Sequence, residues 1–194
     1  MLFPVRFEGG WTLSSSSDPR ALAIVDGTGR HAGHGPHYSR RTPGSRTFTG
    51  IGQEVVLLHE SECAVWAVVY QRTPAKRGSG CSRGRAGITD TSARYIWRNM
   101  LFRRLPGCDV LASSLIKSAT IATYAAWAAK YGALPSERLR TEVAIKAVRS
   151  SNPGYCYKRA GWTVDRTVRG KLYLYAPPPT NIRACPTSET SSLP

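Results

Sequence analysis

Acidic residues are scarce in this sequence. Its 194 residues include 12 Asp and Glu against 27 Lys and Arg, which gives a formal net charge of +15 and a pI of about 10.2. A field of this sign gathers polyanions, and nucleic acid is the leading candidate partner. The alternative is a basic surface that binds no particular partner.

Long apolar runs are also missing. No stretch of 18 apolar residues occurs, so neither a transmembrane helix nor a membrane partner is expected. Residues 1–10 contain Glu8 and lack a basic stretch followed by an apolar one, which argues against secretion. We therefore expect a cytoplasmic protein.

Cysteine pairs with metal-binding or redox spacing are absent. The five cysteines are an odd number and widely spaced: Cys63, Cys81, Cys108, Cys156 and Cys185. Because no Cys-x-x-Cys pair occurs, we expect free thiols rather than a disulfide framework or a zinc ribbon.

The chain does have enough apolar material for one domain, with 41% hydrophobic residues and five Trp. We expect a flexible segment at residues 1–20, a folded domain at 21–176 that includes a basic loop at 72–94, and a flexible tail at 177–194. The sequence gives no indication of the oligomeric state.

Apolar patterning predicts an α+β fold with a mixed sheet. Residues 48–59 and 63–71 predict a hairpin, and 95–105 predict a further strand before Pro106-Gly107. Small apolar residues at spacings of three and four predict a long helix over 110–131. The remaining predicted elements are a helix or strand at 21–25, a strand at 139–145, a short helix at 154–160 and a hairpin of 162–168 with 171–175.

Positive charge is concentrated between Gln71 and Arg104, where Asp90 is the only acidic residue. Several glycines make this stretch a flexible loop, whose arginines can settle on phosphates without reading a base sequence. The basic residues are Arg72, Lys76, Arg77, Arg83, Arg85, Arg94, Arg98, Arg103 and Arg104. A solvated loop without a partner is the alternative.

Three pieces occur in a suggestive order: a basic strand at Met100 to Leu105, the long helix, and a short tyrosine-bearing helix that closes on Gly161-Trp162. In this order they resemble the acetyltransferase superfamily called GNAT. The resemblance implies a single domain with a central, mostly antiparallel sheet flanked by helices.

The loop before the long helix carries part of this resemblance. The superfamily's pyrophosphate loop follows Arg/Gln-x-x-Gly-x-Gly/Ala, and this chain has Arg104-Leu-Pro-Gly107-Cys-Asp109. The resemblance places Arg103, Arg104 and Gly107 at a cofactor, although only one of the two arginines faces the site because they alternate along a strand. Asp109 stands where a small residue would let backbone N–H groups approach phosphates, which argues against acetyl-CoA.

Further motifs narrow the resemblance. They are His37-Tyr38-Ser39, Phe102-Arg103-Arg104 before a helix with Ser113-Ser114, and Tyr157 five residues before Trp162. Over about residues 36–176 the chain is similar to the phage Mom family of DNA-modification proteins. The resemblance implies a transferase that places a methylcarbamoyl (acetamido-type) group on N6 of adenine in double-stranded DNA, which blocks restriction enzymes. The compartment would be the cytoplasm of an infected bacterial host.

The candidate catalytic residues are His37, Tyr38, Ser114, Glu142 and Tyr157. The adenine amino group is a poor nucleophile, and His37 suits the role of the base that removes its proton. Tyr157 would donate a proton to a leaving group or stack on a base, with core packing as the alternative. Glu142 would orient His37, bind a cation, or form a salt bridge with Arg140 or Lys146. Ser114 would hydrogen-bond an acyl-like group or cap its helix.

The donor and cofactor are left open. His31, His34 and His37 are spaced in a way that invites a metal, but the Gly-rich context and the lack of nearby Cys argue against structural zinc. An iron site made of His37 with a carboxylate would fit the facial arrangement of non-haem iron.

Adenine in a duplex is paired, so we expect the base to be flipped out, with Tyr38, Tyr155 and Trp162 as candidate stacking partners. Core packing is the alternative for each of the three, most of all for Trp162. The candidate DNA-binding residues are Arg40, Arg41, Arg46, Arg83, Arg85, Lys158 and Arg159.

Two other classes of function remain open. One is an acetyl-CoA-dependent N-acetyltransferase, which Asp109 disfavours. The other is a non-enzymatic DNA-binding, anti-restriction protein, which the pair His37-Tyr38 disfavours.

Overall fold

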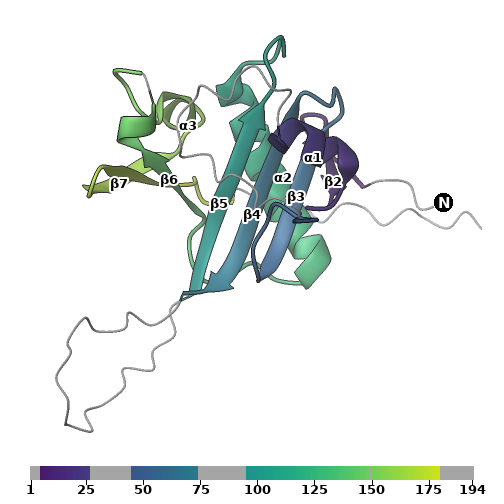
Figure 1. The fold of residues 1–194 in the computed structure, drawn as a ribbon. Helices are drawn as coiled ribbons and strands as arrows, with labels where there is room; N and C mark the ends of the chain where they lie inside the picture. The colour runs from purple at the N-terminus through teal and green to yellow at the C-terminus, as the bar shows by residue number, and fades with distance from the viewer. Residues whose placement is uncertain (1–4, 27–44, 74–94, 149, 180–194) are drawn as a thin grey trace, which may run out of the picture.

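The computed structural model describes residues 5–26, 45–73, 95–148 and 150–179. They form an α+β fold with one eight-stranded sheet of order β1-β2-β3-β4-β5-β6-β8-β7 (Figure 1). The strands are β1 Arg6–Phe7, β2 Trp11–Ser14, β3 Gln53–His59, β4 Ala64–Arg72, β5 Tyr95–Arg104, β6 Arg140–Ala144, β7 Thr163–Val168 and β8 Lys171–Tyr175. The helices are α1 Pro19–Asp26, α2 Ala112–Tyr131 and α3 Tyr155–Arg159, with a 3-10 turn η1 at Ile145–Ala147.

The middle of the sheet is covered on both faces. Helix α1 packs on β4 and β5 on one face, and α2 with α3 covers the other (Figure 1). This explains why β3 and β4 are nearly continuous apolar runs: the side chains on both faces of these strands must be buried. Trp66 and Val68 face α2, whereas Val65 and Ala67 face α1.

Helix α2 has its small residues against the sheet. Ala119, Ala122 and Ala126 are all at most 1% exposed, and Trp127 is buried with them. Short side chains let the helix axis approach the strands closely, which is why an Ala-rich segment suits this position. Among the helices in the described parts of the chain, none is long and apolar enough to span a membrane.

The first twenty residues contribute to the sheet. Strand β2 pairs antiparallel with β3, and Trp11 is fully buried, with its indole N–H donating to Ser118 Oγ of α2 at 2.9 Å. The folded domain therefore extends into the segment 1–20 that the sequence places outside it.

The other predicted elements occur in the predicted order. The residues at 21–25 form a helix, the strand prediction for 48–59 is too long because β3 begins at Gln53, and the long helix begins two residues late. The last hairpin turns at Arg169-Gly170, where both residues have positive φ, of 49° and 75°. Residues 180–194 of the predicted tail and most of the basic loop lie outside the described residues.

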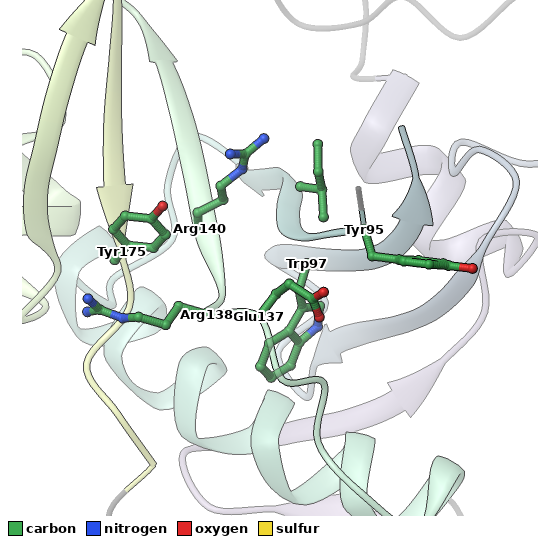
Figure 2. A pocket seen from close by; sticks show the side chains of 7 residues that line it. Tyr95, Trp97, Glu137, Arg138, Arg140 and Tyr175 are labelled. Atoms are coloured by element: carbon green, nitrogen blue, oxygen red, sulfur yellow. The ribbon is translucent and has the colours of Figure 1, made fainter. Parts of the chain in front are cut away.

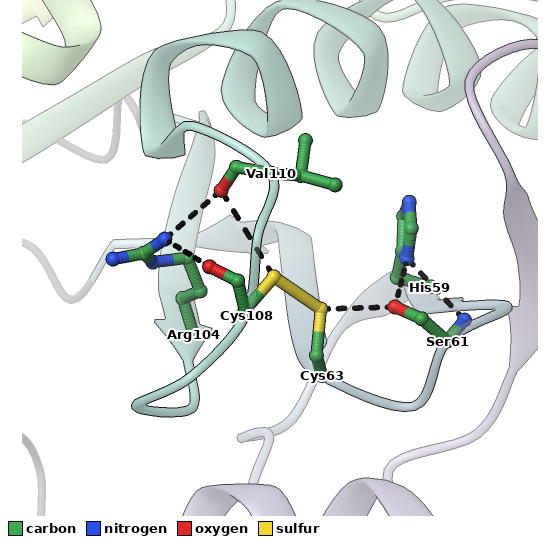
Figure 3. Close-up of a disulfide and its surroundings, with 6 residues drawn as sticks. All are labelled: His59, Ser61, Cys63, Arg104, Cys108 and Val110. Carbon is green, nitrogen blue, oxygen red and sulfur yellow. Dashed lines mark hydrogen bonds between the residues drawn. A yellow bond between two sulfur atoms is a disulfide. The ribbon is translucent and has the colours of Figure 1, made fainter.

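A disulfide joins two segments at one end of the sheet. Cys63, in the β3–β4 turn, is bonded to Cys108, in the loop before α2, with Cα atoms 5.7 Å apart (Figure 3). The two meet because the β4–β5 ladder ends beside them, with Leu105 N donating to Cys63 O at 2.7 Å. The prediction of free thiols is wrong for this pair, while Cys156 is free as predicted; Cys81 and Cys185 lie outside the described residues.

We expect Cys63→Ser to lower the free energy of unfolding by up to about 4 kcal/mol, because the cross-link closes a loop with a sequence separation of 45. Urea unfolding should show this loss under oxidising conditions, and Cys156→Ser should show little change. Added dithiothreitol should bring wild type down to the level of the variant. A difference that survives full reduction would mean that the serine, not the lost bond, is responsible.

Candidate functional site

Strands β5 and β6, which are neighbours in the middle of the sheet, pair over only a short distance and then diverge. They run parallel, and their ladder consists of the single pair Arg98↔Arg140. Beyond this pair, β5 continues to Arg104 and β6 to Ala144 without pairing to each other. Backbone groups on the facing edges are thereby available to another partner, since a ladder no longer uses them.

The divergence coincides with a bulge on the other side of β5. Ala67 of β4 pairs with Leu101, and the next residue, Val68, pairs with Asn99, so Met100 has no partner in β4. Such an extra residue bends a strand and re-aims its side chains. Here it leaves two carbonyl groups, those of Ala67 and Leu101, to be satisfied by a side chain.

Asn99 satisfies them. Its amide nitrogen donates to Ala67 O at 3.0 Å and to Leu101 O at 2.8 Å. Its carbonyl oxygen accepts from the hydroxyl of Tyr157 at 2.8 Å and from that of Thr141 at 3.3 Å. One buried carboxamide therefore links β4, β5, β6 and α3.

Tyr157 lies on α3 with its ring against the aromatic core. Its centroid is 5.2 Å from that of Trp162 in an edge-on contact and 6.4 Å from that of Trp66. Helix α3 begins after Gly154, at φ 72°, where an added Cβ would come within 3.1 Å of Leu172. The close approach of this turn to β8 requires glycine and fixes where Tyr157 enters the sheet.

Two threonines of α2 accept hydrogen bonds from the two tryptophans that contact Tyr157. Trp66 Nε1 donates to Thr123 Oγ1 at 2.9 Å, and Trp162 Nε1 donates to Thr120 Oγ1 at 3.1 Å. Both tryptophans are buried, so their N–H groups need these acceptors. Trp162 is therefore a core residue, which is the alternative stated for it, and it is not exposed for stacking on an extruded base.

The loop before α2 is held by Arg104. One guanidinium nitrogen, Nη1, donates to the carbonyl oxygens of Cys108 and Val110, both at 2.9 Å (Figure 3). Gly107 has φ 82° and open space around it, and Asp109 is exposed. Leu111 is the N-cap of α2 and supplies no side-chain cap, so the first N–H groups of the helix rely on other partners.

The two predicted cofactor arginines lie on opposite faces of β5. Arg103 donates to Val25 O, at the end of α1, at 2.8 Å, whereas Arg104 turns to the loop before α2. The two arginines therefore alternate along β5, and Arg104 is the one beside the N-terminus of α2, where its Nη1 holds the loop. A cofactor role for either arginine stays a prediction.

Two predicted catalytic residues have other contacts. Glu142 Oε2 forms an ion pair with Lys171 Nζ at 2.9 Å, so the partner is neither Arg140 nor Lys146. This contact raises the pKa of Lys171, chiefly through the hydrogen bond from the ammonium group. Ser114 is exposed in the first turn of α2 and makes no capping bond, which rules out its predicted capping role.

The predicted DNA-binding residues that the structure describes are at the surface. Arg46 and Arg159 are exposed, and Lys158 is half-buried and bonded to Asn152 Oδ1. Tyr155 is 52% exposed, which suits a stacking role. The other predicted site residues, His37, Tyr38, Arg40, Arg41, Arg83 and Arg85, lie outside the described residues.

Within the described ranges, no group of three or more His, Cys, Asp and Glu side chains is placed to hold a metal ion. The predicted iron site depends on His37, which lies outside those ranges, so it stays a prediction.

The chain matches no family model, no curated protein and no solved structure.

Asn99 and Thr141 are the residues that sequence reasoning missed. The available signal was an asparagine inside an otherwise apolar and basic strand, where its type is unfavourable. A polar residue at such a place indicates a bulge or a buried hydrogen-bond network.

We expect Asn99→Ala to destabilise the protein by about 2–3 kcal/mol, because it strands the Tyr157 hydroxyl and two carbonyl groups in the interior. Tyr157→Phe should cost about 1 kcal/mol, since it removes only one hydrogen bond. Urea unfolding of the single and double variants should show a coupling of about 1 kcal/mol or more. Additive effects would mean that the two side chains do not share a bond in solution.

Proposed function

We propose that this chain is a GNAT-like group transferase that modifies N6 of adenine in DNA, as the resemblance to the Mom family implies. The observation that carries the proposal is the hydroxyl of Tyr157, fixed on Asn99 where β5 and β6 stop pairing. Sequence predicted a reactive tyrosine from the short helix alone. The structure adds a polar anchor and an unpaired sheet edge beside it.

The orientation of Tyr157 favours a specific role. Its proton points inward to Asn99 Oδ1, because the amide nitrogen of Asn99 is already committed to two carbonyl groups. Toward a substrate, a phenol so held acts as a hydrogen-bond acceptor. The exocyclic amino group of adenine is a donor, so Tyr157 suits positioning of the nucleophile better than protonation of a leaving group.

The base that takes the proton is assigned by residue chemistry to His37. Attack by the amino group on the activated carbonyl of a donor forms the new C–N bond, and the bond from that carbon to the donor's leaving group breaks. The nitrogen loses one of its two protons to neutral imidazole, which can return it to the leaving group. His37 lies outside the described residues, which end before it at Asp26 and resume after it at Ser45.

The surroundings of α2 do not fit the pyrophosphate of coenzyme A well. A phosphate at this helix N-terminus would meet the exposed Asp109 carboxylate, and Arg104 Nη1 is occupied by two carbonyl groups. No step of the proposed reaction is therefore assigned to coenzyme A. The net charge of +15 supports DNA as the acceptor, because phosphate contacts dominate such binding.

The test is to express the chain with a plasmid, digest the plasmid to nucleosides and weigh them. We expect a deoxyadenosine of increased mass with wild type, at least a hundredfold less with Tyr157→Phe, and none with His37→Ala. Tyr173→Phe is the matched control, because it removes a hydroxyl from β8 at a residue that has no role in the proposed site. It should modify DNA as wild type does.

Unmodified deoxyadenosine together with stabilisation of the protein by acetyl-CoA would favour an N-acetyltransferase instead. Unmodified deoxyadenosine together with tight DNA binding would favour a non-enzymatic DNA-binding protein. Persistent modification by Tyr157→Phe would refute the role given to that hydroxyl.

DNA binding itself can be tested in the basic loop. Arg83→Gln combined with Arg85→Gln should weaken duplex binding and lower the slope of log K against log salt by about 1–2, because each phosphate contact contributes about 0.9. Fluorescence anisotropy of a labelled duplex over a salt series measures both quantities. Unchanged affinity would mean that Arg83 and Arg85 do not contribute to DNA binding.

A further inference from the structure

The hollow at the first residues of β5 does not converge on a ligand. Its lining includes Arg138 and Arg140 beside aromatic side chains (Figure 2). Arg138 donates to Ala176 O at 3.4 Å, and the two guanidinium groups point apart. Reactive groups do converge at the opposite end of β5, around the bond between Cys63 and Cys108.

Both cysteines of this bond are open to solvent in part. Cys63 and Cys108 are each partly exposed, and their neighbours Glu62, Gly107 and Asp109 are exposed. An added Cβ at Gly107 would meet no atom within 4 Å, so the loop leaves open space beside Cys108. Thiols and disulfides in solution can therefore approach the pair, which exchange chemistry requires.

The two sulfur atoms have neighbours of opposite hydrogen-bonding character. The hydroxyl of Ser61 donates to Cys63 Sγ at 2.9 Å, whereas Cys108 Sγ lies 3.9 Å from the carbonyl oxygen of Val110, which can only accept (Figure 3). A donor stabilises a thiolate and an acceptor suits a thiol, because only the thiol carries a proton. In the reduced pair, these contacts favour a thiolate at Cys63 and a thiol at Cys108.

His59 extends the chain of groups that ends at Cys63. Its Nδ1 lies 2.7 Å from Ser61 Oγ, and the backbone N–H of Ser61 donates to the same nitrogen at 3.4 Å. The neutral ring therefore carries its proton on Nε2 and can accept another on Nδ1. The thiol proton of Cys63 can pass to Ser61 Oγ while the hydroxyl proton passes to Nδ1, which leaves a thiolate and an imidazolium bridged by the serine.

The position of His59 suits this role. The residue is 7% exposed, and its ring stands edge-on to that of Trp11 with centroids 5.2 Å apart. An added Cβ at Gly10 would lie 3.1 Å from His59 Nε2 and 2.9 Å from Glu60 Oε1, so the carboxylate and this side of the ring border the same small space. A carboxylate there favours the imidazolium form.

The other carboxylates near the pair act more on Cys108 than on Cys63. Glu62, next to Cys63, is paired with Arg20 at 3.2 Å. Asp109, next to Cys108, is exposed and forms no ion pair with the described residues. An unpaired carboxylate disfavours a thiolate beside it, which again assigns the thiolate to Cys63.

Hydrogen bonds hold the two segments together without the disulfide. Leu105 N donates to Cys63 O at 2.7 Å, and Arg104 Nη1 donates to the carbonyl oxygens of Cys108 and Val110. None of these bonds involves a sulfur atom, so none depends on the S–S bond. The reduced cysteines therefore stay near each other, which a reversible couple requires.

We propose that Cys63 and Cys108 form a thiol–disulfide exchange site, with Cys63 as the attacking thiolate and Cys108 as the resolving thiol. Its substrate is a disulfide of the glutathione class. In the cytoplasmic setting expected from the sequence, a disulfide is usually such a reactive couple and not a structural cross-link. The site is separate from Tyr157, and the proposal does not depend on adenine modification.

The exchange balances in two steps. In the first, the Cys63 thiolate attacks one sulfur of glutathione disulfide, a mixed disulfide forms, and one glutathione thiolate leaves. In the second, the Cys108 sulfur attacks Cys63 Sγ, and the proton of Cys108 ends on the second glutathione, which leaves as a thiol. The protein gives two electrons to glutathione disulfide, and a dithiol such as dithiothreitol reverses the sequence.

Trapping of the mixed disulfide tests which sulfur attacks. Cys108→Ser and Cys63→Ser lose the same cross-link, so each controls for the stability of the other. The reduced variants are treated with glutathione disulfide, and its addition is timed by peptide mass spectrometry. We expect addition to Cys63 in Cys108→Ser to be about tenfold faster than addition to Cys108 in Cys63→Ser. Equal rates, or a faster Cys108, would overturn the proposal.

Substitution of Ser61 tests the activation of Cys63. In the Cys108→Ser background, Ser61→Ala should slow addition to Cys63 about fivefold, as expected for the loss of one hydrogen bond to the thiolate. Ser61→Thr keeps the hydroxyl and should restore the rate. Ser15→Ala, which removes another exposed hydroxyl, should leave it unchanged. An unchanged rate in Ser61→Ala would refute the relay.

The wild-type chain tests whether the couple closes. Dithiothreitol should reduce the Cys63–Cys108 bond in the absence of denaturant, and glutathione disulfide should then restore it with little glutathione left on Cys63. Cys156→Ser should behave in the same way, because Cys156 takes no part. A bond that is reduced only in denaturant, or glutathione that stays on Cys63, would overturn the proposal.

Discussion

The side-chain carboxamide of Asn99 makes the hydrogen bonds that the backbone ladder lacks where the sheet is least regular. The bulge at Met100 and the divergence of β5 from β6 both remove ladder partners, and both occur within two residues of Asn99. Four hydrogen bonds to the Asn99 side chain satisfy two backbone carbonyl groups and two hydroxyl groups there. Because a buried polar network is stable only when all its members are paired, the divergence of the strands and the position of Tyr157 are set together.

This constraint explains why helix α3 can be so short. Five residues have little helical stability of their own. The segment is fixed instead by contacts outside the helix: the Tyr157 hydroxyl on Asn99, the ring against Trp162, and the close approach of Gly154 to β8. The catalytic role proposed for Tyr157 thus rests on rigidity supplied by the sheet.

The sequence predicted the elements with strong periodicity and missed those whose signal is long-range. The central strands and α2 follow from apolar runs and small residues at helical spacing, whereas β2 is only four residues between glycines and serines. The disulfide was missed because Cys63 and Cys108 are 45 positions apart in the sequence, and only the β4–β5 ladder brings them together. In the candidate site, Tyr157 was recognisable by its short helix, but Asn99 has a role only once the bulge is known.

The hydrogen bond between Trp11 and Ser118 affects the order in which parts of the chain fold. The two residues are 107 positions apart, yet the indole of Trp11 is fully buried and needs its acceptor on α2. During synthesis, β2 leaves the ribosome long before that acceptor exists, so its apolar side chain has no complete site to enter. Docking of the N-terminal strands is therefore expected to follow formation of α2. The edge of the sheet formed by β1 and β2 would then be one of the last parts to fold.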